Sequence, residues 1–94
     1  MQFDWDDEKE KSNIEKHGID FSTAVLVFGD NNRIEKYDEL HSIYEDRYIT
    51  IGRIREVTVV VVVVYTEREA LIRIISARLA TKREEEAYYN AKNH

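Results

Sequence analysis

The sequence predicts an α+β fold in which an antiparallel meander of strands carries helices from the N-terminal part of the chain and a closing C-terminal helix. Two helical segments with start and stop signals precede residue 30, and runs rich in β-branched residues, separated by turn residues, fill residues 33–76. A charged segment of helical composition follows. The chain has 94 residues and no linker, so residues 1–94 are expected to form a single domain.

The beginning of the chain predicts a short strand followed by a helix. Residues 2–5 suit the strand, and Asp4 or Asp6 is placed to cap a helix over residues 6–17, whose acidic first turn suits the positive end of the helix dipole. Gly18 is a stop signal, because glycine adopts the left-handed conformation after a helix without strain. The helix has little apolar content, so we expect it on the surface, with one face left for another role.

A second helix is predicted over the segment that follows. Ser22 is the expected N-cap, and Phe21 is expected to pack on Leu26 in the first turn beyond it. The helix should end near Gly29, where the sequence continues as a turn. Residues 24–28 are uniformly apolar, so this helix should be buried against the sheet.

The remaining strands form the predicted meander. Six consecutive valines in one of them lack polar alternation, which indicates a central strand buried on both faces. Exposed, such a run would promote aggregation. The strands are expected at residues 33–37, 47–53, 57–65 and 71–76, with a polar loop at residues 38–45 and the closing helix at residues 80–91.

The composition excludes several classes of protein. The chain has no cysteine, which rules out disulfides, thiolate metal sites and a thiol nucleophile. Its first residues are acidic, and its longest apolar run, residues 59–65, is far too short to cross a bilayer. We therefore expect a soluble cytoplasmic protein without membrane contact.

The basic residues are concentrated in the second half of the chain. The net charge of -5 argues against a nucleic-acid partner, because Lys and Arg drive phosphate binding. However, residues 47–83 carry eight basic side chains, seven of them arginine, and only three acidic ones. Planar guanidinium groups suit phosphate, so this segment is a candidate RNA-binding surface. The alternative is that these arginines only keep exposed strand faces soluble.

The first helix offers one group of candidate residues. Lys9, Asn13 and Lys16 are spaced by four and three residues and should share a helix face, with His17 in the last turn. The negative end of a helix dipole favours a protonated imidazole, which suits a proton donor or a phosphate ligand. The alternative is that His17 only caps the helix, as basic residues commonly do there.

The last strand and the valine strand offer a second group. Arg73 interrupts an apolar run and Arg78 follows five residues later, so both guanidinium groups are expected near one end of the sheet, where they could bind phosphate. An internal salt bridge from Arg73 to an acidic residue of the first helix is an equal alternative. Tyr65 could stack on a base, but completion of the core is the favoured interpretation.

The sequence lacks the usual signals of cofactor and metal chemistry. It has no glycine-rich phosphate loop, no serine nucleophile elbow and no His pair at metal-ligand spacing, so no cofactor and no metal are expected. The residues present favour metal-independent RNA cleavage, in which the 2′-hydroxyl of the substrate attacks the neighbouring phosphorus. Protein groups then need only transfer protons and stabilise charge.

Four blocks of the sequence, in this order, resemble one protein family. They are Phe3-Asp4-Trp5-Asp6; Lys9 and Asn13 with the run Lys16-His17-Gly18-Ile19-Asp20-Phe21; the R-x-x-x-I-G strand at residues 47–53; and the run Arg73-Ile74-Ile75-Ser76-Ala77-Arg78 with Ala80 and residues 84–88 beyond it. No single block is specific, but their order and the chain length together resemble the BrnT toxins.

The resemblance implies a RelE-like α+β fold, a ribonuclease activity that arrests translation, and neutralisation by a BrnA-like antitoxin in a hetero-oligomer. The toxin would then contact DNA only indirectly, through the antitoxin. The functional face carried over from the family comprises Lys9, Lys16, His17, Arg47, Arg53, Arg73 and Arg78. The chain departs from the family at Tyr65, where members often have His, and in its acidic net charge.

We therefore predict a catalytic group and an RNA-binding group that meet in one groove, where the end of the first helix joins the arginines of the later strands. The catalytic group is His17, for proton transfer, with Arg47, Arg73 and Arg78 for the phosphate; the RNA-binding group is Lys9, Lys16, Arg53 and Tyr65. The alternative functions are a non-catalytic binding module, whose acidic N-terminal half holds a basic partner, and a degenerate toxin that only binds its antitoxin.

Overall fold

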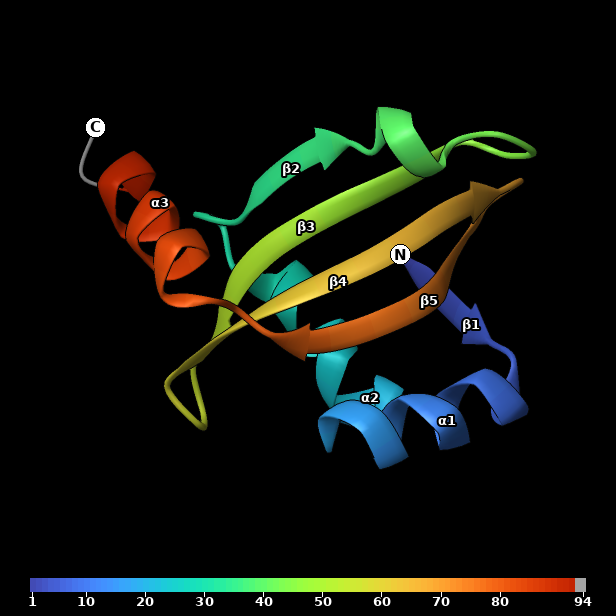
Figure 1. The fold of residues 1–94 in the computed structure, drawn as a ribbon, viewed down its shortest axis with the longest axis horizontal. Helices are drawn as coiled ribbons and strands as arrows, with labels where there is room; N and C mark the ends of the chain where they lie inside the picture. Colours follow the sequence, from blue (N-terminus) through green and yellow to red (C-terminus); the bar gives the residue numbers. More distant parts are fainter. Residues whose placement is uncertain (93–94) are drawn as a thin grey trace.

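The computed structural model describes residues 1–92 and shows one five-stranded sheet with helices on both of its faces (Figure 1). The strands are β1 (Gln2–Trp5), β2 (Ile34–Tyr37), β3 (Arg47–Ile54), β4 (Val59–Arg68) and β5 (Leu71–Leu79). The α-helices are α1 (Asp7–His17), α2 (Phe21–Ala24) and α3 (Lys82–Lys92), and the 3-10 helices are η1 (Val25–Gly29) and η2 (Glu39–His41). This arrangement confirms the α+β class.

The sheet is mixed, so the expectation of a purely antiparallel meander is wrong. The strand order is β1-β5-β4-β3-β2, and β1 pairs in parallel with β5, whereas the other neighbours are antiparallel. Short turns join β3 to β4 and β4 to β5, and such turns permit only antiparallel pairing. β1 is followed by helices and not by a hairpin turn, so no turn determines its direction in the sheet. The residues of a strand also do not indicate which strand it pairs with.

Helix α1 begins and ends where the sequence indicates. Asp6 is the N-cap, and its Oδ1 accepts hydrogen bonds from the backbone N–H groups of Glu8 at 2.8 Å and Lys9 at 3.1 Å. These two hydrogen bonds lower the pKa of Asp6 because they stabilise its ionised form, and the bond from Lys9 has the larger effect. Gly18 ends the helix with φ of 70°, the conformation that favours glycine.

Asn13 attaches α1 to the outer edge of β5. β1 covers this edge only from Leu71 to Ile74. Beyond it, the Asn13 amide accepts from the N–H of Ala77 at 3.0 Å and donates to its C=O at 2.9 Å, and it also donates to the C=O of Ile19 at 2.9 Å. Asn13 is 5% exposed, so its side chain replaces a missing strand for backbone groups that would otherwise be buried without partners.

The second helical segment differs from the prediction in its cap and in its last turns. Asp20, not Ser22, is the N-cap, since its carboxylate accepts from the N–H of Thr23 at 2.6 Å. The helix therefore starts at Phe21, which is fully buried, while Leu26 is 49% exposed and is not part of the core cluster that contains Phe21. After one α-turn the chain continues as the 3-10 helix η1.

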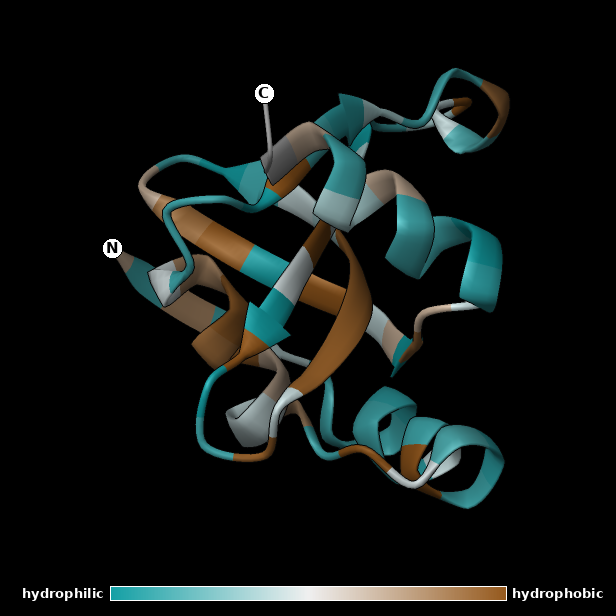
Figure 2. Cartoon of the chain, turned by 90° about the vertical axis from the view of Figure 1, so that its left-hand side faces the viewer, coloured by the Kyte–Doolittle hydropathy of each residue, from teal (hydrophilic) through white to brown (hydrophobic). Residues whose placement is uncertain are grey.

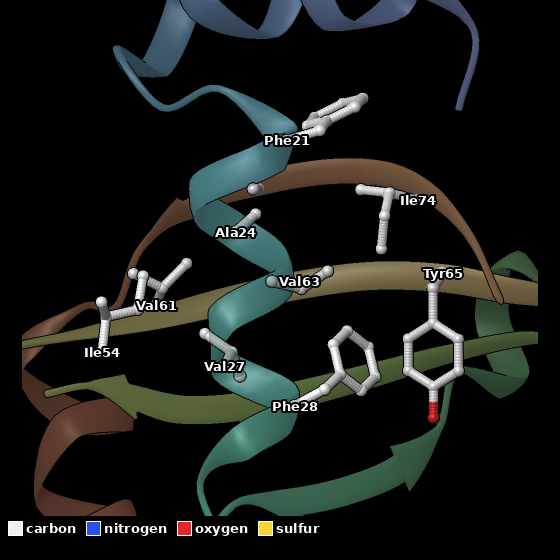
Figure 3. Packing of buried hydrophobic residues seen from close by; sticks show 10 residues of the cluster. Phe21, Ala24, Val27, Phe28, Ile54, Val61, Val63, Tyr65 and Ile74 are labelled. Atoms are coloured by element: carbon white, nitrogen blue, oxygen red, sulfur yellow. The ribbon is translucent and has the colours of Figure 1, made fainter. Parts of the chain in front are cut away.

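The larger part of the core lies between the sheet and the α2–η1 segment (Figure 3). Val60, Val61, Val62 and Val63 of β4 are all buried, which confirms the central strand expected from the valine run. Their side chains alternate between this core and a smaller one on the opposite sheet face, where Tyr88 of α3 packs. In Figure 2 the long hydrophobic stretches lie on strands, whereas α1 and α3 are mainly hydrophilic in colour.

Gly52→Ala is expected to destabilise the fold by about 1–3 kcal/mol, the usual cost of overpacking a core. A Cβ at Gly52 would lie 2.7 Å from Cγ1 of Val27 and 3.1 Å from Cβ of Arg33, so η1 would have to move away from β3. Gly29→Ala is the matched control, since its Cβ would meet nothing within 4 Å. Urea denaturation measures both, and an equal effect of the two substitutions would contradict this account.

Candidate functional site

The candidate site lies on the sheet face where α3 packs, which we call the α3 face. Helix α3 covers only one end of this face, as Figure 1 shows, and packs there on Ile51, Val60 and Val62. Farther along the strands, four directly paired residues cross the uncovered part of the face. This set, which we call the arginine row, consists of Asp4 on β1, Arg73 on β5, Thr66 on β4 and Arg47 on β3.

The register places Arg47 and Arg73 on the same side of the sheet. Each is paired directly with Thr66, and residues that face one another across adjacent strands project from the same face. Their Cα atoms are two strand spacings apart, or roughly 9–10 Å. Both arginines are partly exposed. Two long guanidinium side chains at this separation can converge on one phosphate above Thr66.

The two arginines differ in how they are held. Nη1 of Arg73 donates to Oδ2 of Asp4 at 3.0 Å, an ion pair that orients the guanidinium. The side chain of Arg47 has no ion-pair or hydrogen-bond partner within the described part of the chain, residues 1–92. Thr66 is buried and donates from Oγ1 to the C=O of Asp46 at 2.6 Å, which ties the loop before β3 to the centre of the row.

Two residues that the sequence analysis did not single out belong beside this row. Lys36 on β2 is paired with Ile49, and Ser76 on β5 is paired with Val64, so both lie on the α3 face in the row next to the arginines. The sequence analysis treated Asp4 as a possible helix cap and as part of the first family block, and not as a site residue. Its role beside Arg73 depends on the parallel pairing of β1 with β5, which no local sequence signal predicts. Side chains alternate between the two faces along β2, so Lys36 could have been assigned to the α3 face if the pairing register of β2 with β3 had been known.

Arg78 is on the α3 face but serves a different purpose. Its Nη1 and Nη2 donate to the two carboxylate oxygens of Glu84 at 2.7 and 2.9 Å, so the pair anchors α3 to the end of β5. This bidentate contact lowers the pKa of Glu84 to about 2. Because its charge is already paired, Arg78 is less available to phosphate than Arg47.

Glu84→Gln is expected to lower the free energy of unfolding at pH 7 by about 1 kcal/mol, a value that allows for solvent screening of this partly exposed pair. The pKa of Glu84 is lower in the folded chain than its ordinary value of 4.5, so the stabilisation is complete above about pH 4.5 and is lost as the pH falls toward 2. Urea denaturation should therefore show the variant and wild type converging at low pH. Glu86→Gln, at an exposed position of the same helix, is the control and should show no such convergence.

The residues predicted on α1 do not join the arginine row. Lys9, Lys16 and His17 are exposed, but Asn13 points inward to β5 and therefore does not belong to an outward polar row on α1. The positive charge of Arg73 contributes to the lowered pKa of Asp6, which caps the start of α1. His17 is the last residue of this helix, about 15 Å farther along its axis. The common groove expected for His17 and Arg73 is therefore not found in the described part of the chain.

Tyr65 is a core residue, which confirms the interpretation that its ring completes the core. It is 4% exposed, and its ring packs 5.2 Å from that of Phe28 and 5.5 Å from that of Tyr48. Its hydroxyl donates to Glu35 at 3.3 Å, and burial, followed by the nearby Glu35, raises its pKa. A base could not stack on Tyr65 without opening the core.

Arg53 lies at the other end of β3, about 20 Å from Arg47. Its N–H donates to Oδ2 of Asp30 at 2.8 Å, and its buried Nε has no hydrogen-bond partner among the described residues. A pocket of about 620 Å³ opens here, and Arg55, Asn32 and Tyr88 also line it. Arg53 is thus separate from the arginine row, with α3 packed between them.

Within residues 1–92, no three His, Asp or Glu side chains gather as metal ligands, and none of the helices has the length and apolar character needed to span a membrane.

Comparison with known proteins identifies the family of the chain. No curated protein matches the chain. Residues 5–84 match the family model described as the ribonuclease toxin BrnT of type II toxin-antitoxin systems, which covers well over half of the chain. The chain therefore belongs to the BrnT family of ribonuclease toxins.

Proposed function

We propose that this chain is an active endoribonuclease that cleaves RNA without a metal ion, arrests translation in the cytoplasm and is neutralised by a BrnA-like antitoxin. Membership of the BrnT family supports the reaction class. The observation that carries the proposal is the placement of Arg47 and Arg73 on one exposed sheet face, on either side of Thr66. Contact with DNA would occur only through the antitoxin.

The arginine row suits the charge that develops during RNA cleavage. The 2′-hydroxyl oxygen forms a bond to the adjacent phosphorus, its proton leaves, and the bond to the 5′-oxygen breaks as that oxygen takes up a proton. The products are a 2′,3′-cyclic phosphate and a 5′-hydroxyl. The intermediate phosphorane carries extra negative charge, which two converging guanidinium groups stabilise more strongly than they stabilise the starting diester. Asp4 holds Arg73 in position for this task.

The test is cleavage of a short RNA by the purified chain at low salt in the presence of EDTA. We expect fragments that end in a 2′,3′-cyclic phosphate. The matched control is the same oligonucleotide with 2′-deoxyribose throughout, which should remain intact because it lacks the attacking hydroxyl. Cleavage of the deoxy strand, or cleavage only after a divalent metal is added, would contradict the mechanism.

In bacteria, induced expression of the chain is expected to stop growth and protein synthesis, and co-expression of the product of the adjacent gene is expected to restore both. Growth that continues at the normal rate in the presence of folded toxin would contradict the proposed arrest of translation. Rescue by the adjacent gene, followed by mass determination of the purified complex, establishes the partner and its stoichiometry.

A further inference from the structure

The loop between β2 and β3, residues 38–46, carries the most exposed large hydrophobic side chains of the molecule apart from Met1. Leu40 is 77% exposed, Ile43 is 75% exposed and Tyr44 is 99% exposed. We call these three residues the apolar loop tip. A single exposed apolar residue is ordinary, but three within five positions form a cluster of the kind that marks contact with another macromolecule.

Hydrogen bonds hold the base of the loop that carries the apolar loop tip. Oγ of Ser42 donates to the C=O of Asp38 at 2.6 Å and accepts from the N–H of Arg47 at 2.8 Å. The N–H of Asp38 donates to the C=O of Arg47 at 2.8 Å, which closes the loop. These hydrogen bonds fix the backbone at the base of the loop, so less backbone entropy is lost when a partner binds the tip.

The charge around the loop tip selects the kind of partner. Residues 38–46 contain four carboxylates and neither Lys nor Arg. Glu45 pairs with Arg68 at 3.0 Å and Asp38 contacts His41 at 2.9 Å, whereas Glu39 and Asp46 form no ion pair within the described residues, so the loop keeps a net negative charge. RNA is disfavoured here, because its phosphates would meet negative charge. A protein segment that combines apolar side chains with Lys or Arg is complementary to an apolar tip with an acidic rim.

The loop is joined directly to the candidate active site. Its last residue, Asp46, precedes Arg47, and the C=O of Asp46 accepts the hydrogen bond of Thr66 at the centre of the arginine row. A partner seated on the loop tip is therefore adjacent to Arg47 and, across Thr66, to Arg73.

We propose that residues 38–46 are the docking surface for the antitoxin, which inserts a cationic, amphipathic segment against Leu40, Ile43 and Tyr44 and so covers the arginine row. This inference rests on the proposed function, from which it takes the antitoxin as partner. It adds the location of the contact, the chemistry of the binding segment and the means of inhibition, which is exclusion of RNA from Arg47 and Arg73.

The test measures binding of the full-length product of the adjacent gene to three forms of this chain by calorimetry. The loop variant is Leu40→Ser, Ile43→Ser, Tyr44→Ser. The control variant is Leu26→Ser, Val57→Ser, Leu79→Ser, which removes three apolar side chains of 49–55% exposure elsewhere on the surface. We expect at least 100-fold weaker binding by the loop variant and a change below threefold for the control. The loop variant should still cleave RNA, and the antitoxin should no longer inhibit it.

A charge variant tests the rim separately. Glu39→Lys, at an exposed position of the loop, is expected to weaken binding by about tenfold at low salt, with the difference shrinking as salt is added. Equal effects at all salt concentrations would contradict the cationic character of the partner segment.

Four outcomes would overturn the proposal. Equal binding by the loop variant and wild type would place the antitoxin elsewhere and leave the ribonuclease function intact. Loss of RNA binding by the loop variant, with antitoxin binding unchanged, would show that the tip contacts RNA. A wild-type chain that dimerises through the tip, and becomes monomeric in the loop variant without loss of antitoxin binding, would identify a second copy as the occupant. Failure of the wild-type chain to bind the antitoxin would refute the antitoxin part of the proposed function as well.

Discussion

Arg73→Ala is expected to lower the rate of RNA cleavage by about 10²–10³-fold, the usual effect of removing one group that stabilises transition-state charge. Arg47→Ala should have an effect of the same order, because the register pairs both arginines with Thr66 and so puts them on the same face of the sheet. Arg73→Lys should be intermediate, since Lys keeps the charge but lacks the planar fork that binds two phosphate oxygens in parallel. Single-turnover cleavage of a short RNA at a fixed salt concentration measures these rates.

Two controls make this prediction specific. Arg83→Ala removes an exposed arginine of α3 and should leave the rate within about threefold of wild type, because loss of one distant charge affects only general attraction to RNA. His17→Ala should also stay within about threefold, since His17 ends α1 far from the row. A His17→Ala loss as large as that of Arg73→Ala would show that the reaction takes place at the end of α1 and not at the arginine row.

Asn13→Ala is expected to lower the free energy of unfolding by about 2–4 kcal/mol, the largest stability effect that we predict for a surface helix residue here. The substitution leaves the N–H and C=O of Ala77 and the C=O of Ile19 without their partner. Each unsatisfied buried group costs about 1–3 kcal/mol, and water that enters reduces the sum. In a domain of this size the melting temperature should fall by roughly 10–20 °C.

Ser12→Ala is the matched control for Asn13→Ala, because Ser12 is the adjacent, exposed residue of the same helix. It should change the melting temperature by no more than about 2 °C, since alanine has the higher helix propensity and no buried bond is lost. Asn13→Asp separates donor from acceptor: the carboxylate can still accept from the N–H of Ala77, but it repels the two carbonyl oxygens. If Asn13→Ala melts like wild type, Asn13 does not hold α1 to the sheet.

The candidate site shows what reasoning from sequence can reach. Arg73 was selected because it interrupts an apolar strand and guanidinium suits phosphate, and Arg47 was selected from the family resemblance; the strand register puts both on one face of the sheet. Asp4, Lys36 and Ser76 could not, because their place beside the arginines depends on which strands are neighbours and in what register. The outward position of Asn13 on α1 was wrong because it too depends on how the elements pack. Helix spacing shows that Lys9, Asn13 and Lys16 share a face, but not whether that face points outward.

By itself, the sequence determined the elements of this protein that local physics controls. The Asp6 cap, the Gly18 stop, the buried valine strand and the order of helices and strands follow from backbone hydrogen bonding, φ preferences and periodicity, which act over a few residues. Only the tertiary structure decided the parallel β1–β5 pair, the inward turn of Asn13, the Arg78–Glu84 anchor and the separation of His17 from Arg73. These contacts join residues distant in the chain or depend on how whole elements pack, so the free energy of the complete fold selects them.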